Sequence, residues 1–124
     1  MISFWMDEAL GLEQSLAPAE PLIGNTRCDI CIVGGGYTGL WSALRLKEMD
    51  PSADVVVIDA DICGRGGSGR NCGFVQHWGH KAPSLMELVG HGEGRNLLSL
   101  SQQAVNEIGA FCQQNHIDAE YRKK

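Results

Sequence analysis

The sequence predicts an α/β fold built on a strand–helix–strand unit whose two strands lie parallel in one sheet. Two short runs rich in β-branched residues, 28–33 and 53–61, are separated by a segment with apolar residues at helical spacing. The second run, ADVVVIDAD, contains an unbroken stretch of Val and Ile, which is typical of a parallel strand covered on both faces. A helix between two parallel strands is the usual connection, and it is expected to be right-handed.

The composition is that of a soluble globular domain. The chain has 124 residues, of which 44% are hydrophobic and 20% charged, and this is enough for one domain with its own core. Its net charge of −5 disfavours a nucleic-acid partner, and no apolar run reaches the roughly 18 residues of a membrane-spanning helix. The N-terminus lacks the basic start of a secretory signal, and five cysteines do not make a regular disulfide framework. We therefore expect a cytoplasmic protein.

The first half of the chain divides at its proline and glycine residues. Residues 1–27 contain several of these breakers and are expected to form a leader across the domain surface, with room for one short helix. The first strand, 28–33, ends abruptly in three glycines. The helix that follows is expected to stop at Asp50, because the residue before a proline avoids the α region.

The second half is predicted to be helical. Residues 74–80, FVQHWGH, are ambiguous between strand and loop. Ser84 and Glu87 fit a capping box that opens a short helix, which the glycines within 90–94 then interrupt. A longer amphipathic helix is expected from about 93 to 115. No third parallel strand follows, so the sheet is expected to be incomplete.

A glycine-rich turn, CIVGGGYTGL, joins the first strand to its helix. Gly34, Gly36 and Gly39 form a G-x-G-x-x-G pattern, which is a weak indication alone in a chain with 16 glycines. Its place after a strand and before a helix, with Asp59 ending the next strand, makes it the fingerprint of a Rossmann-like dinucleotide site. Gly34 permits the tight turn, Gly36 lets a pyrophosphate approach the backbone, and Gly39 lets the helix pack closely on the sheet.

The same pattern indicates how a dinucleotide would bind. Amides at the helix start, around Tyr37 and Thr38, are expected to point at phosphates. Asp59 is expected to accept hydrogen bonds from the adenosine ribose, and an acid there favours NAD or FAD over NADP. The alternative is that the glycines only make a turn and Asp59 only ends a strand in water. The combined spacing and context favour the dinucleotide site.

A second glycine cluster, GRGGSGRNCG at residues 64–73, follows the acidic residue, and an NAD-dependent dehydrogenase does not need one. Together, DICIVGGGYTGLWSALRLKE…VVVIDADICGRGGSGRNCGFV resembles the N-terminal part of the FAD-dependent amine and amino-acid oxidoreductases. This is the family of D-amino-acid oxidase, glycine oxidase and sarcosine oxidase, and the nearest subgroup oxidises γ-glutamylputrescine and similar amines. The resemblance covers residues 28–121 and extends loosely to the SFW near the N-terminus.

The resemblance implies that the second loop wraps the FAD pyrophosphate and ribityl chain. In the family this loop commonly reads G-A-S-G-R-N-G-G, and here Gly67 replaces the alanine and Cys72 a glycine. The glycines would form a nest of backbone amides around phosphate, to which Ser68 would add a hydroxyl. Positive charge would come from Arg65 or Arg70.

Asn71 stands where related enzymes with covalently bound flavin have a histidine, so the resemblance implies non-covalent FAD. The predicted cofactor-binding residues are Gly34, Gly36, Tyr37, Thr38, Gly39, Asp59, Ala60, Arg65, Gly67, Ser68, Arg70, Asn71 and Gly73.

Two further clusters are weaker candidates. Cys28-x-x-Cys31 has the spacing of a redox or zinc pair, but no second well-spaced pair follows it. We therefore interpret both cysteines as core residues and expect no metal site. His77 and His80 lie after the second loop, where a role near the flavin or substrate is the less favoured alternative to a structural or solvated one.

The resemblance implies a flavoenzyme that oxidises the C–N bond of a small amine or amino acid, with the flavin accepting a hydride equivalent. Residues 1–27 would be the leader and 28–124 the N-terminal portion of the FAD-binding domain, truncated and without the substrate domain. We name no catalytic residue and expect a partner chain that completes the fold. The alternatives are a non-catalytic dinucleotide-binding fragment, a subunit of a split enzyme, an NAD-dependent dehydrogenase, and, least favoured, an RNA-binding arginine–glycine tract.

Overall fold

The structure is a computed structural model that describes residues 2–12 and 19–122. Residues 13–18 of the predicted leader, and the last two residues of the predicted FAD-binding domain, lie outside the described residues. The chain divides between Cys72 and Gly73 into two compact units. The elements in chain order are α1 (Phe4–Leu12), β1 (Ile30–Val33), α2 (Tyr37–Met49), β2 (Val55–Ile58), η1 (Gly67–Gly69), η2 (Trp78–Lys81), α3 (Ala82–Val89) and α4 (His91–Gln114), where η marks a 3-10 turn.

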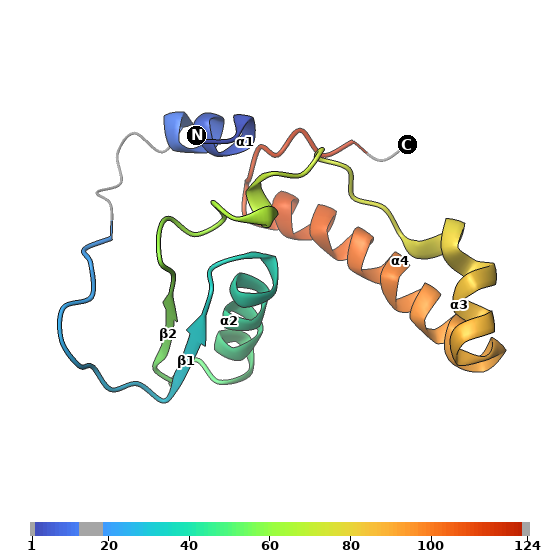
Figure 1. The fold of residues 1–124 in the computed structure, drawn as a ribbon, viewed down its shortest axis with the longest axis horizontal. Coiled ribbons are helices and arrows are strands. Elements are labelled where there is room, and N and C mark those ends of the chain that lie inside the picture. Colours follow the sequence, from blue (N-terminus) through green and yellow to red (C-terminus); the bar gives the residue numbers. More distant parts are fainter. Residues whose placement is uncertain (1, 13–18, 123–124) are drawn as a thin grey trace. The chain divides into compact units, whose positions relative to one another are not determined.

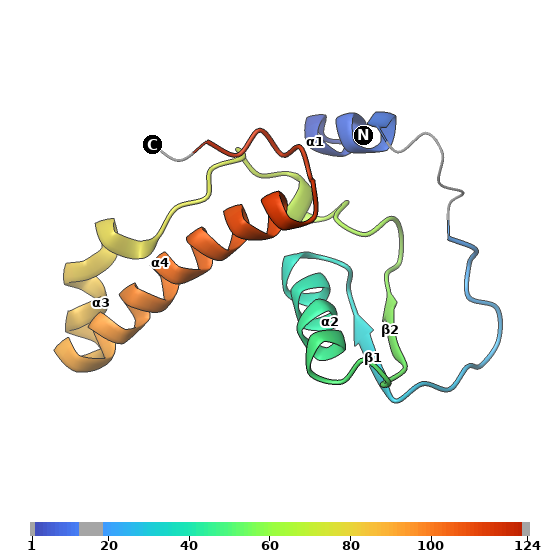
Figure 2. The same cartoon turned by 180° about the vertical axis from the view of Figure 1, so that it is seen from behind.

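The first unit contains the predicted parallel sheet. β1 and β2 pair in parallel, with Ile30 opposite Val55 and Val33 opposite Ile58, and α2 connects them. Both views show α2 lying along the two strands (Figure 1, Figure 2). The strand–helix–strand prediction is therefore confirmed, although each strand has only four residues.

α2 ends where the sequence predicts. Its last residue is Met49, and Asp50 leaves the helical conformation with φ −139° and ψ 91°. The Asp50 carboxylate then accepts hydrogen bonds from the Ser52 backbone N–H at 3.0 Å and from its hydroxyl at 2.6 Å. These bonds hold the pKa of Asp50 below its ordinary value, the hydroxyl bond having the largest effect. The turn after α2 is thus stabilised by the Asp50 side chain as well as by the restricted backbone before Pro51.

Burial in the sheet is less than the sequence predicts. The four side chains of β2 are half-buried, and Val33 at the end of β1 is 82% exposed. Among the described residues, no hydrophobic side chain is fully buried. The prediction that 53–61 is covered on both faces is therefore wrong for this structure. The physical reason is that α2 alone among the described elements packs extensively on the strands.

The second unit is a helical hairpin in which α3 and α4 lie side by side in both views (Figure 1, Figure 2). Gly90 joins them with φ +83°, a backbone conformation that residues other than glycine rarely adopt. The predicted interruption thus occurs at Gly90 alone, and α4 already begins at His91. The predicted long helix is confirmed. In the described part of the chain, no helix is both long and apolar enough to cross a membrane.

Two local features of this unit were left open or predicted differently from the sequence. The ambiguous segment 74–80 forms no strand, and its end becomes η2, whose Trp78 N–H donates to the Ser101 hydroxyl of α4 at 3.1 Å. The predicted capping box at Ser84 is wrong, because α3 already begins at Ala82 and Ser84 lies inside it. Pro83 explains the difference, since proline is favoured in the first turn of a helix, where no N–H is required.

The hairpin predicts opposite effects for two glycines of α4. A Cβ at Gly94 would lie 2.9 Å from Cγ and 3.2 Å from Cα of Met86 in α3, whereas one at Gly92 would meet nothing within 4 Å. We expect Gly94→Ala to destabilise the unit by about 1–2 kcal/mol through overpacking. Gly92→Ala is expected to stabilise it by up to about 1 kcal/mol because alanine favours helix. Urea unfolding followed by circular dichroism measures both, and equal effects would contradict the helix contact.

Candidate functional site

The first glycine turn sits at the carboxyl end of β1. Gly34 has φ +101°, and its N–H donates to the carbonyl oxygen of Ile58 at 2.7 Å, which extends the parallel ladder by one bond. A Cβ at Gly39 would lie only 2.0 Å from the Gly34 carbonyl oxygen and 3.3 Å from the side chain of Ile32. The turn therefore requires glycine at 34 for its conformation and at 39 for the close approach of α2.

Asp59 ties the second strand to this turn. Its Oδ2 accepts a hydrogen bond from the N–H of Gly35 at 2.7 Å, and its Oδ1 accepts one from the N–H of Asp61 at 3.0 Å. The bond from Gly35 is the main reason that the pKa of Asp59 lies below its ordinary value. A carboxylate offers about four acceptor sites, so two amides leave capacity for the ribose hydroxyls that the sequence predicts as partners.

The second glycine cluster begins against the first. The N–H of Gly64 donates to the carbonyl oxygen of Gly35 at 2.8 Å. A Cβ on Gly35 would lie 2.1 Å from Sγ of Cys63, and Gly35 is buried. Sequence reasoning missed Gly35 and Cys63, because the G-x-G-x-x-G pattern treats the second position as variable.

Ser68 in η1 forms the next contact between the two loops. Its Oγ accepts a hydrogen bond from the N–H of Tyr37 at 3.0 Å, and a Cβ on Gly36 would lie 2.9 Å from the same oxygen. Two predicted phosphate ligands, the Tyr37 amide and the Ser68 hydroxyl, are therefore bonded to each other. A hydroxyl accepts and donates at once, so Ser68 retains a proton to donate to a phosphate oxygen.

Asn71 completes this network. Its Nδ2 donates to the hydroxyl of Tyr37 at 2.7 Å and to the carbonyl oxygen of Ser68 at 2.5 Å. The side chains of Tyr37, Ser68 and Asn71 thus lock the start of α2 to the end of η1. All three were predicted from the sequence as cofactor-binding residues, and the structure brings them together.

The remaining predicted residues lie outside this network. Arg65 forms an ion pair with Asp61, and because both side chains are exposed this pair contributes little stability. Thr38, Ala60, Gly67 and Arg70 are exposed. Gly73, with φ +74°, is the first residue of the second unit.

The segment at the start of α1 supplies contacts that sequence reasoning missed. The Ser3 hydroxyl donates to the Gly69 carbonyl oxygen, and the Trp5 indole N–H donates to that of Asn71. The only indication in the sequence was the loose resemblance around SFW.

The cysteines and histidines do not assemble a further site. Cys28 is half-buried and Cys31 is exposed, so the interpretation of both as core residues is wrong for Cys31. Burial, followed by the proximity of Cys31, raises the pKa of the Cys28 thiol, which disfavours the reactive thiolate. His77 accepts a hydrogen bond from the N–H of Gly79 at 2.9 Å, which is a local structural role. Within 2–12 and 19–122, no group of three or more potential ligands could hold a metal ion.

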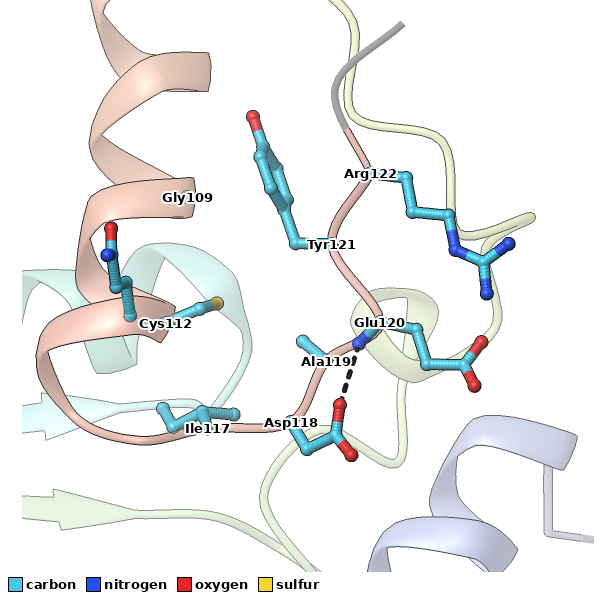
Figure 3. Close-up of a pocket in the computed structure, with 9 residues that line it drawn as sticks. Gly109, Cys112, Ile117, Asp118, Ala119, Glu120, Tyr121 and Arg122 are labelled. Carbon is cyan, nitrogen blue, oxygen red and sulfur yellow. Dashed lines mark hydrogen bonds between the residues drawn. The ribbon is translucent and has the colours of Figure 1, made fainter.

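The second unit contains a cavity of about 550 Å³ between the end of α4 and residues 117–122 (Figure 3). The Tyr121 ring lies beside Gly109, and its hydroxyl donates to the Val105 carbonyl oxygen at 3.1 Å. The Glu120 N–H donates to Asp118 at 3.4 Å, as the dashed line shows. None of the predicted cofactor-binding residues lines this cavity.

The first unit is thus an α/β structure with two glycine-rich loops bonded to each other at the carboxyl ends of parallel strands, the edge at which open α/β sheets bind their ligands. Residues 29–124 match the family described as FAD dependent oxidoreductase (DAO), and the chain belongs to this family. The resemblance inferred from the two glycine loops is confirmed. The family is FAD-dependent, so FAD is the cofactor.

Curated relatives agree with this assignment. The chain is 38% identical over 107 residues to gamma-glutamylputrescine oxidoreductase of Escherichia coli, covering 86% of this chain and 25% of that protein. It is 34% identical over 115 residues to the probable oxidoreductase OrdL of Rhizobium meliloti, covering 92% and 26%. The chain spans about a quarter of the length of these relatives. No solved structure gives a significant match.

Proposed function

We propose that the chain forms the N-terminal portion of the Rossmann-like FAD-binding domain of an oxidoreductase that oxidises the C–N bond of an amine or amino acid. The observation that carries this proposal is the direct bonding of the two glycine loops, through Gly64 to Gly35 and through Tyr37 to Ser68. A generic dinucleotide turn uses the first loop alone. The second loop, fixed against it, supports a site long enough for the extended FAD molecule.

The residues present fit FAD. A Cβ at Gly34 would meet nothing within 4 Å, so the space beside this backbone is open to a phosphate, and the first turn of α2 contributes the positive end of its dipole. Asp59 would hold the ribose hydroxyls while its bonds to Gly35 and Asp61 keep it ionised. Ser68 and the backbone of η1 would hold the pyrophosphate, and either Arg65 or Arg70 would neutralise its charge. The bound flavin supplies the redox chemistry by accepting a hydride equivalent.

The finer parts of the proposal have separate support. The donor class is supported by the relative at 38% identity, whose name gives gamma-glutamylputrescine as its substrate. Non-covalent attachment is supported by Asn71, because its amide side chain offers no nucleophile through which this loop could bond the flavin. The substrate domain would correspond to the part of these relatives that the chain does not cover, and a cytoplasmic location fits the composition.

A partner that completes the fold is supported by the exposed apolar surface of the sheet, where Val33 is 82% exposed. The same observation favours a second candidate, a non-catalytic FAD-binding subunit of a split enzyme. The two differ in whether turnover requires a separately encoded chain.

The visible absorption spectrum tests the proposal. The chain is expressed together with any coding sequence that follows it, and free flavin is removed by gel filtration. We expect the two absorption bands of oxidised flavin, bleaching on anaerobic addition of an amine or amino-acid substrate, and full release of the flavin on acid precipitation. A colourless protein that binds NAD would overturn the FAD site. A yellow protein that no amine or amino acid reduces, in the presence of co-expressed neighbouring gene products, would overturn the donor class.

A further inference from the structure

We propose that residues 3–6, at the start of α1, form a strap that orders the second glycine loop for FAD, with Ser3 and Trp5 as positioning residues. This inference rests on the proposed function, because it assigns the loop to the cofactor. α1 and the loop belong to the same compact unit, although 66 residues of sequence separate the bonded partners. The strap is defined here as residues 3–6.

Two side chains of the strap donate hydrogen bonds to main-chain carbonyls of the loop. The Ser3 hydroxyl bonds the carbonyl oxygen of Gly69 at 2.5 Å. The Trp5 indole Nε1–H bonds the carbonyl oxygen of Asn71 at 2.9 Å. These two carbonyls bracket Arg70, in the stretch where η1 ends and the predicted phosphate-binding residues cluster.

Ser3 acts on the strap and the loop at the same time. Its Oγ accepts a hydrogen bond from the Met6 N–H at 3.3 Å, and its carbonyl oxygen accepts one from the Asp7 N–H at 2.9 Å. The first bond is an N-cap, which supports the first turn of α1. The same hydroxyl then donates to the loop, so formation of the helix start and ordering of the loop are coupled.

Met6 fills the space that the loop glycines leave open. A Cβ on Gly69 would lie 3.0 Å from Cγ of Met6, and a Cβ on Gly64 would lie 3.4 Å from its Sδ. Gly64 also has φ +83°, and its carbonyl oxygen would be 2.3 Å from a Cβ on Gly69. The loop therefore cannot supply its own side chains here, and the strap supplies one.

These contacts matter because a glycine-rich loop loses more conformational freedom on ordering than any other. If the loop were ordered only by FAD, that entropy would be subtracted from the affinity for the cofactor. The trans peptide group also transmits the restraint: the Trp5 bond fixes the carbonyl of Asn71, so the N–H of Cys72 is held pointing away from Trp5. The strap thus fixes the direction of a backbone donor that lies between the predicted residues Asn71 and Gly73.

The test compares Trp5→Phe and Ser3→Ala with Leu12→Ala, all in the complete flavin-loaded protein. Trp5→Phe keeps the aromatic packing and removes only the N–H. Leu12 is 79% exposed at the end of α1 and serves as the control. We expect the dissociation constant for FAD, measured by recovery of free-flavin fluorescence, to rise about fivefold for each strap variant and to stay unchanged for the control.

A second readout does not depend on the cofactor. Hydrogen exchange of the amides of residues 69–72 in the apoprotein should be faster in both strap variants, while exchange in the strands stays the same. Absence of FAD binding by the wild-type protein would contradict the proposed function itself. Wild-type binding together with unchanged affinity and unchanged loop exchange in the variants would overturn the strap alone. Faster exchange throughout the unit would also overturn it, because that result indicates general destabilisation.

Discussion

Replacing Gly39 by alanine is expected to abolish detectable FAD binding and to destabilise the first unit by about 3 kcal/mol, the upper part of the range for overpacking. The added Cβ would lie 2.0 Å from the carbonyl oxygen of Gly34 and 3.2 Å from the carbonyl carbon of the same residue. The obstacle is backbone, and it cannot swing aside, because the N–H of Gly34 is bonded to Ile58 across the sheet. Relief of the clash requires α2 to separate from β1, and this separation would open the phosphate-binding turn.

The measurements for Gly39→Ala are urea unfolding and titration with FAD. Gly11→Ala is the matched control in the same unit, because a Cβ there meets nothing within 4 Å and Gly11 lies in a helix. We expect this control to retain FAD binding and to gain a few tenths of a kcal/mol from helix propensity. Retention of normal FAD affinity by Gly39→Ala would show that the close approach of helix and turn is not needed for the site.

Local patterns in the sequence were sufficient for the βαβ unit. The two Val/Ile runs, the three glycines and Asp50-Pro51 each determine the structure of their own neighbourhood, so the order and approximate ends of β1, α2 and β2 followed from them. The predicted capping box was wrong because two local patterns overlap at this helix start. Ser84 and Glu87 have the correct spacing, but Pro83 also fits a first turn, and spacing alone does not decide between two overlapping helix starts.

Contacts between distant residues could not be predicted from spacing. The sequence identified Tyr37, Ser68 and Asn71 individually, yet their mutual bonds depend on how the two loops fold back on each other. The strap is the clearest case, because the residue types and spacing of residues 3–6 do not identify a partner beyond residue 60, and the loose resemblance around SFW names none. Burial was overestimated because a Val/Ile run records how hydrophobic a strand is, whereas its coverage depends on which elements pack against it.

Replacing Asp59 by asparagine is expected to weaken FAD binding by about 10- to 100-fold, the range for loss of a hydrogen bond to a charged group. The variant keeps the size of the side chain, but one of its two terminal atoms becomes a donor that opposes either the Gly35 or the Asp61 N–H. The first glycine turn and the ribose site therefore lose the same anchor. Isothermal titration or fluorescence recovery with FAD measures the loss.

Asp61→Asn is the matched control for this substitution. Asp61 pairs with Arg65 on an exposed surface, and it contacts Asp59 only through its backbone N–H, which the substitution leaves in place. We expect a change in FAD affinity of less than about fivefold, in keeping with an exposed ion pair. An equal loss in both variants would indicate that net charge near the site, rather than the bond to Gly35, determines the affinity.

The pH dependence of the free energy of unfolding of the apoprotein shows whether Asp59 stabilises the turn through its charge or through its shape. The pKa of Asp59 is lowered from 3.8 by the bond from Gly35, so the folded state favours the carboxylate. The stabilisation that the Asp59 carboxylate provides is fully present above the pKa of the unfolded state, and it is lost as the pH falls through the lower pKa of the folded state. The stability difference between wild type and Asp59→Asn should therefore be largest near neutral pH and shrink progressively below about pH 4. Because Asp50 has a lowered pKa in both proteins, only their difference isolates Asp59. A difference that stays constant from pH 7 to pH 3 would mean that shape, not charge, connects Asp59 to the turn.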